Sequence, residues 1–188
     1  MDRNIQETLR STMTYGFALG VIVVIYSLIL YLLNIMPVGI LKPMVLLLVS
    51  GIIYFLGLWY FSKIIKKDVF GNRISYWNGF LVAVLLGFFA SILISAYEFL
   101  QNLVIDPEYI DRFISAQIDW MYNFMYEKGI PDDQIMETIE GIEAQADKTY
   151  NFALYIKSVL LNTLWFSIIG FITAAIIRTK TTNPFEES

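Results

Sequence analysis

Residues 76–101, YWNGFLVAVLLGFFASILISAYEFLQ, decide the fold class of this chain. The stretch is apolar for about 20 residues, and at ~1.5 Å rise per residue a helix of that length crosses a hydrocarbon core ~30 Å thick. Small residues recur at every fourth position, which places them on one helix face where a second helix backbone can approach closely. The stretch therefore predicts a packing seam inside a helical membrane protein. The seam consists of Gly79, Ala83, Gly87, Ser91 and Ser95.

The composition agrees with this class. Of the 188 residues, 57% are hydrophobic and 16% are charged, whereas a soluble domain needs a more polar surface. The chain has no Cys and no His, which excludes disulfides, thiol nucleophiles and the commonest general base and transition-metal ligand. We therefore expect a protein that is not an enzyme and has no cofactor and no metal site. The net charge of −4 provides no basic face for nucleic acid.

The first apolar run, residues 15–33, follows a short polar head and predicts the first membrane span. A signal peptide has an apolar core of only ~7 to 15 residues and a small-residue cleavage site, so this run is interpreted as a retained span. Gly16 and Gly20 form a GxxxG pattern within it. The pattern favours packing against a neighbouring helix of the same chain, with homodimerisation as the alternative.

Apolar runs at residues 44–61, 77–100 and 156–177 predict three more spans. Residues 34–43 contain two prolines and a glycine and are typical of a tight turn. The connection at residues 62–75 is the most basic part of the chain. Because short loops rich in Lys and Arg stay in the cytoplasm, four spans place both termini there too. The same charges would also suit anionic lipid headgroups, which is the alternative reading.

Two polar residues in these spans are candidate functional residues. Glu98 lies about 22 residues, or ~33 Å, from the start of the third span, which favours a solvated helix-end carboxylate over an ion, proton or substrate path. Asn162 lies in the outer third of the fourth span, where an amide more often bonds a neighbouring helix than a substrate. Gly170 belongs to a small-residue face of the same span, which we expect to pack against the third-span seam.

An acidic insert, residues 102–150, separates the third and fourth spans and lies outside the cytoplasm by the same topology. Asp106, followed by a proline and a glutamate, predicts a capped helix start, and Gly129 can end that helix. Pro131 begins a second amphipathic helix that is expected to run on toward the fourth span. The insert thus predicts a helical hairpin whose apolar stripes meet each other or, alternatively, a partner. Its acids follow no EF-hand spacing, so a calcium site is a weaker reading.

Three stretches of the chain carry a family resemblance: the turn and helix start at residues 71–80, the outer stretch from Tyr97 through Met125, and the end of the fourth span. In these stretches the chain resembles an uncharacterised family of small bacterial four-span inner-membrane proteins, catalogued as domain of unknown function 4199. The resemblance implies a four-span domain of the bacterial inner membrane, and it carries over no catalytic or binding residues. In the first stretch the residues that carry the resemblance are Gly71, Asn72, Arg73, Ile74, Ser75, Tyr76, Gly79 and Phe80. In the third stretch they are Ile176, Ile177 and Arg178.

The sequence itself specifies no reaction, and it leaves three functional hypotheses. The first is an accessory or interaction protein, seated in the lipid bilayer, whose outer hairpin binds a membrane protein partner or a second copy of the chain. The second is an oligomeric small-solute or ion permease, motivated by Glu98, Asn162 and the small-residue faces. A membrane-embedded enzyme ranks last, because no catalytic constellation is present.

Overall fold

The structure is a computed structural model that describes residues 3–146 and 151–179. Within these residues the chain is helical and contains no strand. Four helices are long and apolar enough to cross a membrane: α1 (Arg3–Leu32), α2 (Leu41–Asp68), α3 (Tyr76–Leu100) and α6 (Phe152–Ile177). The shorter helices α4 (Tyr109–Glu127) and α5 (Asp132–Ala146) form a hairpin between α3 and α6. The predicted all-helical fold with four apolar spans and an inserted helical hairpin is confirmed.

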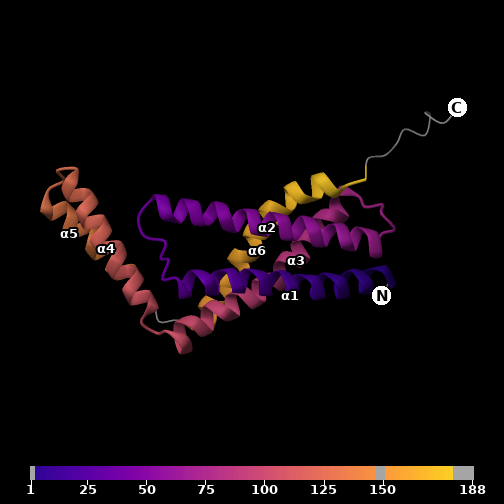
Figure 1. The fold of residues 1–188 in the computed structure, drawn as a ribbon, viewed down its shortest axis with the longest axis horizontal. Helices are drawn as coiled ribbons and strands as arrows, with labels where there is room; N and C mark the ends of the chain where they lie inside the picture. The colour runs from indigo at the N-terminus through magenta and orange to yellow at the C-terminus, as the bar shows by residue number, and fades with distance from the viewer. Residues whose placement is uncertain (1–2, 147–150, 180–188) are drawn as a thin grey trace.

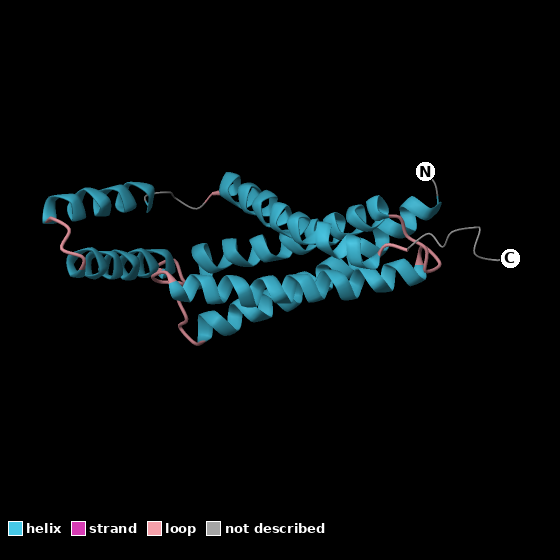
Figure 2. Cartoon of the chain, turned by 90° about the horizontal axis from the view of Figure 1, so that it is seen from above, coloured by secondary structure: helices cyan, strands magenta, loops and turns pink. Residues whose placement is uncertain are grey.

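The four long helices form a bundle around α3, whose most extensive contacts are with α6 and α1 (Figure 1). Helix α2 packs mainly on α6 and α1 and completes the bundle. The start of α1 and the end of α6 lie at one end of the bundle, and the hairpin projects beyond the opposite end (Figures 1 and 2). The first of these ends, which also holds the α2–α3 turn, is labelled the inner end, a name that implies no side of a membrane, and the other is the hairpin end.

The small residues of α3 lie where the neighbouring helices come closest, and all five are buried. At Gly87, an added Cβ would lie 2.3 Å from the Cβ of Phe166 on α6, which is much closer than real side chains approach. Gly170 of α6 faces Ala83 in the same interface, where an added Cβ would lie 3.1 Å from the Ala83 Cβ. The α3–α6 contact thus depends on the absence of side-chain atoms at these positions.

The GxxxG pattern of α1 lies against α3 inside the same chain. An added Cβ at Gly16 would lie 2.8 Å from the carbonyl oxygen of Leu86, and one at Gly20 would lie 3.0 Å from that of Ala90. Backbone atoms cannot rotate away as a flexible side chain can. Both glycines are therefore needed for the α1–α3 contact within one copy of the chain, and neither is free for a dimer contact.

The helices extend beyond the apolar runs. Helix α1 begins at Arg3 rather than near residue 15, and Thr12 within the polar head is fully buried. Helix α2 continues to Asp68, so Lys63, Lys66 and Lys67 belong to its last turns rather than to a connecting loop. Intrahelical hydrogen bonds need no lipid around them, so a helix does not stop where the apolar run stops.

At the inner end, hydrogen bonds join segments that are distant in the sequence. Thr179 N donates to Ile74 O at 2.9 Å, and Ile74 N donates to Thr179 Oγ1 at 2.9 Å. Lys66 Nζ donates to the carbonyl oxygen of Ile177 at 2.7 Å, in the last turn of α6. This clasp brings the α2–α3 turn against the end of α6, so two of the three stretches that carry the family resemblance are in contact.

Replacing Lys66 with methionine should destabilise the bundle by about 1 kcal/mol, because a cation and hydrogen-bond donor is lost from a helix C-terminus. Thermal unfolding in detergent measures this. Lys67→Met is the matched control, because Lys67 is the next residue, is exposed and contacts no α6 carbonyl. Equal melting temperatures for the two variants would contradict a role for the clasp.

Candidate functional site

A hydrogen-bonded polar cluster lies between α3 and α6, made of Ser95, Glu98, Ser158 and Asn162. The Ser158 hydroxyl donates to Glu98 Oε2 at 2.6 Å, and the Ser95 hydroxyl donates to Ser158 Oγ at 3.1 Å. Asn162 Nδ2 lies 3.3 Å from Ser95 Oγ and 3.4 Å from Ser158 Oγ. These hydrogen bonds thus form a network in which the amide donates to the two hydroxyl groups, and the Ser158 hydroxyl donates to the Glu98 carboxylate. The structure brings together the two polar residues singled out in the sequence and adds two serines to them.

Glu98 lies farther from the end of its span than the apolar run indicated. A π-helical turn, Gln101–Ile105, prolongs α3, and the apolar span runs from Tyr76 to Ile105. Seven residues at ~1.5 Å each place Glu98 about 10 Å inside that end. The carboxylate is packed in the helix interface, half-buried and bonded to α6, instead of standing at a solvated helix end. The extension was missed because residues 101–105 carry two polar side chains.

Two tyrosines that the sequence did not single out lie beside the cluster, on α1 and α2. Tyr54 of α2 stacks on Phe166 of α6, with ring centroids 4.6 Å apart, in the neighbourhood of Glu98. Tyr26 of α1 lies near Tyr54, and its hydroxyl is buried without a hydrogen bond in the described part of the chain. A phenol in the middle of the apolar run of α2 is the signal that would have found Tyr54.

The chemistry of the cluster is that of a binding site with a negative end. Among the described residues no ion pair reaches Glu98, and no three carboxylates gather as metal ligands. An acid inside a membrane span is costly and usually marks a path or a site for a ligand. The arrangement contains hydroxyl groups, an amide and a carboxylate, and it can hold a group that donates hydrogen bonds.

A groove of about 460 Å³ runs between α2 and α6 beside the polar cluster. Tyr54 and Asn162 line it and also belong to the polar surroundings of Glu98. Its other lining residues are mostly apolar and lie on the outer surface of the bundle: Leu47, Ser50, Gly51, Phe55, Trp165, Ile169 and Ile172. The groove therefore opens sideways from the bundle and ends at polar groups.

At the hairpin end, Asp106 ties the hairpin to α1. The Tyr31 hydroxyl donates to Asp106 Oδ2 at 3.1 Å, and the Arg112 guanidinium binds both carboxylate oxygens. The Arg112 guanidinium holds the pKa of Asp106 below its usual range, and the hydrogen bond from Tyr31 acts in the same direction. Asp106 was expected to cap the start of α4. The backbone at Glu108, just before α4, also contributes to the lowered pKa of Asp106, and the bonds from Tyr31 and Arg112 add tertiary contacts to this local one.

A second contact fixes α4 against the α1–α2 connection. Gly39 N donates to Gln117 Oε1 at 3.1 Å, and an added Cβ at Gly39 would lie 2.9 Å from Nε1 of Trp120. Gly39 has a φ of +84°, a conformation that glycine adopts readily. The Trp120 indole therefore packs directly on the backbone of this turn.

At the other end of the hairpin, Asn151 has an extended conformation and caps α6. The expectation that the second helix of the hairpin runs on toward the fourth span falls partly on residues 147–150, which lie outside the described part, and α6 has its own start at Phe152.

The comparison with known families agrees with this architecture. A family described as "Protein of unknown function (DUF4199)" matches residues 14–179. The chain belongs to the DUF4199 family. No curated protein and no solved structure matches the chain. The DUF4199 match includes the polar cluster, the groove and the whole hairpin with both its attachments, so these features all lie within the family region.

The Asp106 contact predicts a pH dependence of hairpin docking in this DUF4199 protein. Because the pKa of Asp106 is lowered in the folded state, the stabilisation is present above the ordinary aspartate pKa of about 3.9 and is lost as the pH falls through the lower folded value. Arg112→Gln should move this loss to higher pH. Emission from Trp120, with the other three tryptophans replaced by phenylalanine, reports the undocking.

Lys128→Gln is the control for that experiment. Lys128 is the other basic residue between Tyr109 and Ala146 and directly follows α4. Its Nζ lies 5.8 Å from the centroid of the Phe124 ring. Its replacement should leave the pH midpoint unchanged. A midpoint that is the same in the wild type and in Arg112→Gln would show that the ion pair does not hold the hairpin.

Proposed function

We propose that this protein is a non-catalytic integral protein of the bacterial inner membrane, and that it uses its α4–α5 hairpin as an interaction surface on the extracytoplasmic side. The observation that carries the proposal is an exposed apolar face on the hairpin. This hairpin face consists of Tyr122 and Tyr126, which lie one turn apart on the same side of α4, while Phe124 and Met136 are exposed elsewhere on the hairpin.

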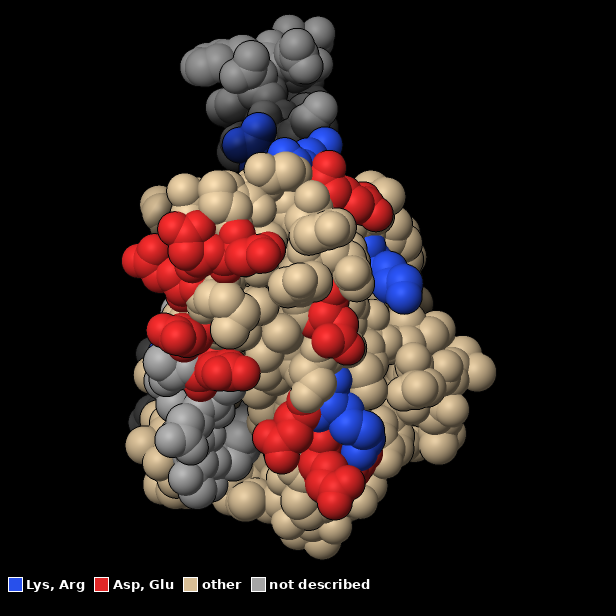
Figure 3. Space-filling model, turned by 90° about the vertical axis from the view of Figure 1, so that its left-hand side faces the viewer, with Lys and Arg blue, Asp and Glu red and all other residues tan. Residues whose placement is uncertain are grey.

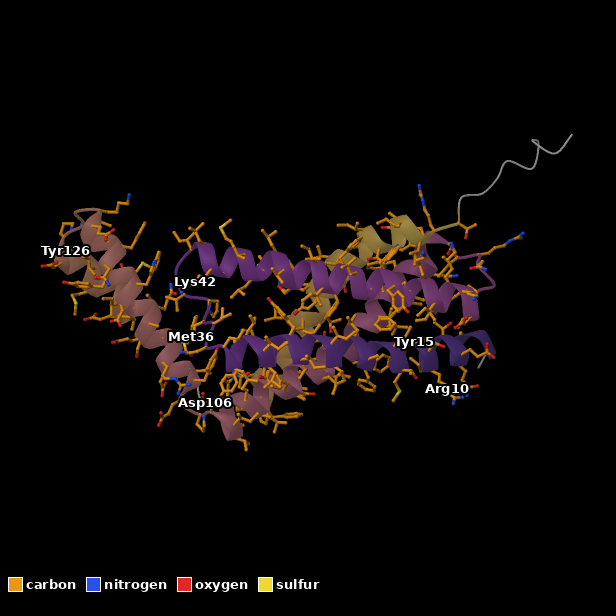
Figure 4. All side chains as sticks on the ribbon, viewed as in Figure 1. Arg10, Tyr15, Met36, Lys42, Asp106 and Tyr126 are labelled. Atoms are coloured by element: carbon orange, nitrogen blue, oxygen red, sulfur yellow. The ribbon has the colours of Figure 1, made fainter. Side chains whose placement is uncertain are left out.

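The hairpin face is left over after the two helices have packed on each other. Ile135 and Ile139 of α5 are buried, whereas α4 has no buried residue. Tyr126 is 64% exposed and lies at the far end of the hairpin, away from Asp106 at its base (Figure 4). Tyr122 and Tyr126 stack with ring centroids 6.1 Å apart, which forms a flat aromatic surface. Tyrosines and other aromatics in such a position are typical of protein interfaces.

The charge around the hairpin face indicates the kind of partner. Residues 106–143 contain ten acids and two bases, and acidic side chains gather on the end of the molecule that the hairpin occupies (Figure 3). This acidity opposes binding to an anionic lipid surface. It favours a protein segment in which basic residues flank apolar ones, because complementary charge guides the encounter and apolar contact supplies affinity.

The distribution of basic residues supports the proposed orientation. Lys66, Lys67, Arg73 and Arg178 lie near the inner end of the bundle, opposite the hairpin. Short loops and helix ends rich in Lys and Arg remain in the cytoplasm. With both termini at that end, the hairpin faces the extracytoplasmic side.

Site-specific photocrosslinking in native membranes tests the proposal. A photoreactive residue at position 126 should give a crosslink to another protein, and one at Tyr60, which is equally exposed on α2, should not give the same product. The double charge reversal Asp119→Lys with Glu127→Lys should abolish the product, and so should high salt. A product that survives both would contradict a basic partner, and crosslinks between copies of this chain would assign the face to a homo-oligomer.

A second candidate function, an oligomeric small-solute or ion permease, is favoured by the position of Glu98 inside a span without a cationic partner among the described residues. Flux into liposomes that depends on Glu98 would support it. Equal flux for the wild type, Glu98→Gln and empty liposomes would remove it.

A further inference from the structure

The groove between α2 and α6 has the shape of a ligand site that opens to the bilayer. Its volume of about 460 Å³ falls in the range of small-molecule sites, ~300 to 1,000 Å³. The space beside Gly51 is empty, because an added Cβ there would meet no atom within 4 Å. Trp165 and Ile172, which line its sides, are exposed on the outer surface of α6. An aliphatic chain can therefore enter from the lipid without any rearrangement of the helices.

The polar end of the groove offers acceptors. Asn162 uses its Nδ2 group to donate to Ser95 and Ser158, so the part of the amide that remains without a bond in the described structure is its carbonyl oxygen. Tyr54 also lines the groove, and a phenol oxygen can accept a hydrogen bond. A ligand group that donates hydrogen bonds fits this end, and a group that only accepts them does not.

The charge behind these two residues is negative. Glu98 is linked to Asn162 through Ser158. No described cation pairs with it. In a medium of low dielectric constant a cation next to an acid stabilises the charged form of that acid, so this end of the groove favours a cationic ligand over an anionic one.

We propose that this groove binds an aliphatic amine, with its ammonium group against Tyr54 and Asn162 and toward the carboxylate of Glu98, and with its chain along the apolar lining. Asn162 is ten residues from the start of α6, which puts the polar end about 15 Å deep. An aminophospholipid could reach this end only by bringing its negative phosphate to the same depth, close to the acid of Glu98, which like-charge repulsion opposes. The occupant is therefore a single-chain amine without a phosphate. The site concerns binding alone and stands independently of what the hairpin does.

Calorimetric titration of dodecylamine into the full chain, in phosphatidylcholine nanodiscs with empty discs subtracted, tests this. We expect saturable binding at one site, and binding at least tenfold weaker for dodecyltrimethylammonium, which has the charge but no N–H donor, and for dodecanol. Glu98→Gln should weaken the binding of dodecylamine at least tenfold and leave the weak binding of dodecanol unchanged. Gly51→Phe should fill the groove and abolish binding, whereas Ile52→Phe, on the neighbouring exposed position, should not.

Thermal unfolding of each variant separates loss of the site from loss of the fold. If Glu98→Gln unfolds, the Gly51→Phe and Ile52→Phe pair still decides the question. Equal affinity for dodecylamine and dodecanol would overturn the proposal, and so would unchanged binding in Gly51→Phe. Binding that disappears in discs containing phosphatidylethanolamine would also overturn it, because the lipid amine would then be the occupant.

Discussion

Replacing Gly87 with leucine is expected to lower the melting temperature of the protein by about 10 °C. The new Cβ would lie 2.3 Å from the Cβ of Phe166 and 2.8 Å from its Cγ, and Phe166 is fully buried and stacked on Tyr54. The Phe166 Cβ is fixed to its backbone, so α3 and α6 must move apart. Overpacking of this kind costs about 3 kcal/mol, which for a chain of this size corresponds to roughly 10 °C.

Gly51→Leu is the matched control for Gly87→Leu, because both glycines lie inside spanning helices and an added Cβ at Gly51 meets no atom within 4 Å. We expect Gly51→Leu to be neutral or slightly stabilising, since leucine has the higher helix propensity. Differential scanning fluorimetry in detergent measures both variants. A drop of similar size in both would trace the effect to the loss of glycine itself and not to the α3–α6 contact.

Gly16→Leu should produce a comparable loss at the other side of α3. The new side chain would meet the carbonyl oxygen of Leu86 at 2.8 Å and the Cβ of Phe89 at 2.7 Å, and the backbone oxygen cannot move without α3. We expect destabilisation by about 3 kcal/mol. Val21→Leu, on the exposed face of the same helix, should change stability by less than about 0.5 kcal/mol.

The same variant distinguishes packing within the chain from dimerisation through GxxxG. If the motif packs α1 on α3, the melting temperature of Gly16→Leu falls at every protein concentration. If it joins two copies, size-exclusion chromatography shows a dimer in the wild type that becomes a monomer of unchanged unfolding temperature in the variant. The second pattern would contradict the contact described here.

Much of the fold could be predicted from the sequence because lipid imposes a simple rule. Spans must be helical and long, so the apolar runs located α1, α2, α3 and α6, and the spacing of small residues in α3 located the faces that meet. Helix ends could not be predicted as well. The lysines of α2 and the π turn after Leu100 continue helices past the apolar runs, and apolarity does not mark where backbone hydrogen bonds stop.

The candidate site could be predicted only in part. Glu98 and Asn162 stand out as polar residues in apolar runs, but their connection through Ser158 depends on the register of α3 against α6, which spacing alone does not give. Tyr54 joins them only because α2 packs on α6. The sequence suggested a local role for Asp106 as a cap, but its distant bond with Tyr31 could not be predicted, because tertiary partners are not visible in the sequence.

The proposed function requires that the hairpin lie outside the cytoplasm, opposite the inner end of the bundle, where a partner can reach it. The absence of cysteine allows single-cysteine labelling on intact cells with a membrane-impermeant maleimide. Ser115→Cys on the exposed surface of α4 should be labelled in intact cells, and Asp68→Cys at the inner end should be labelled only after lysis. Labelling of Asp68→Cys but not Ser115→Cys in intact cells would invert the orientation and contradict the account.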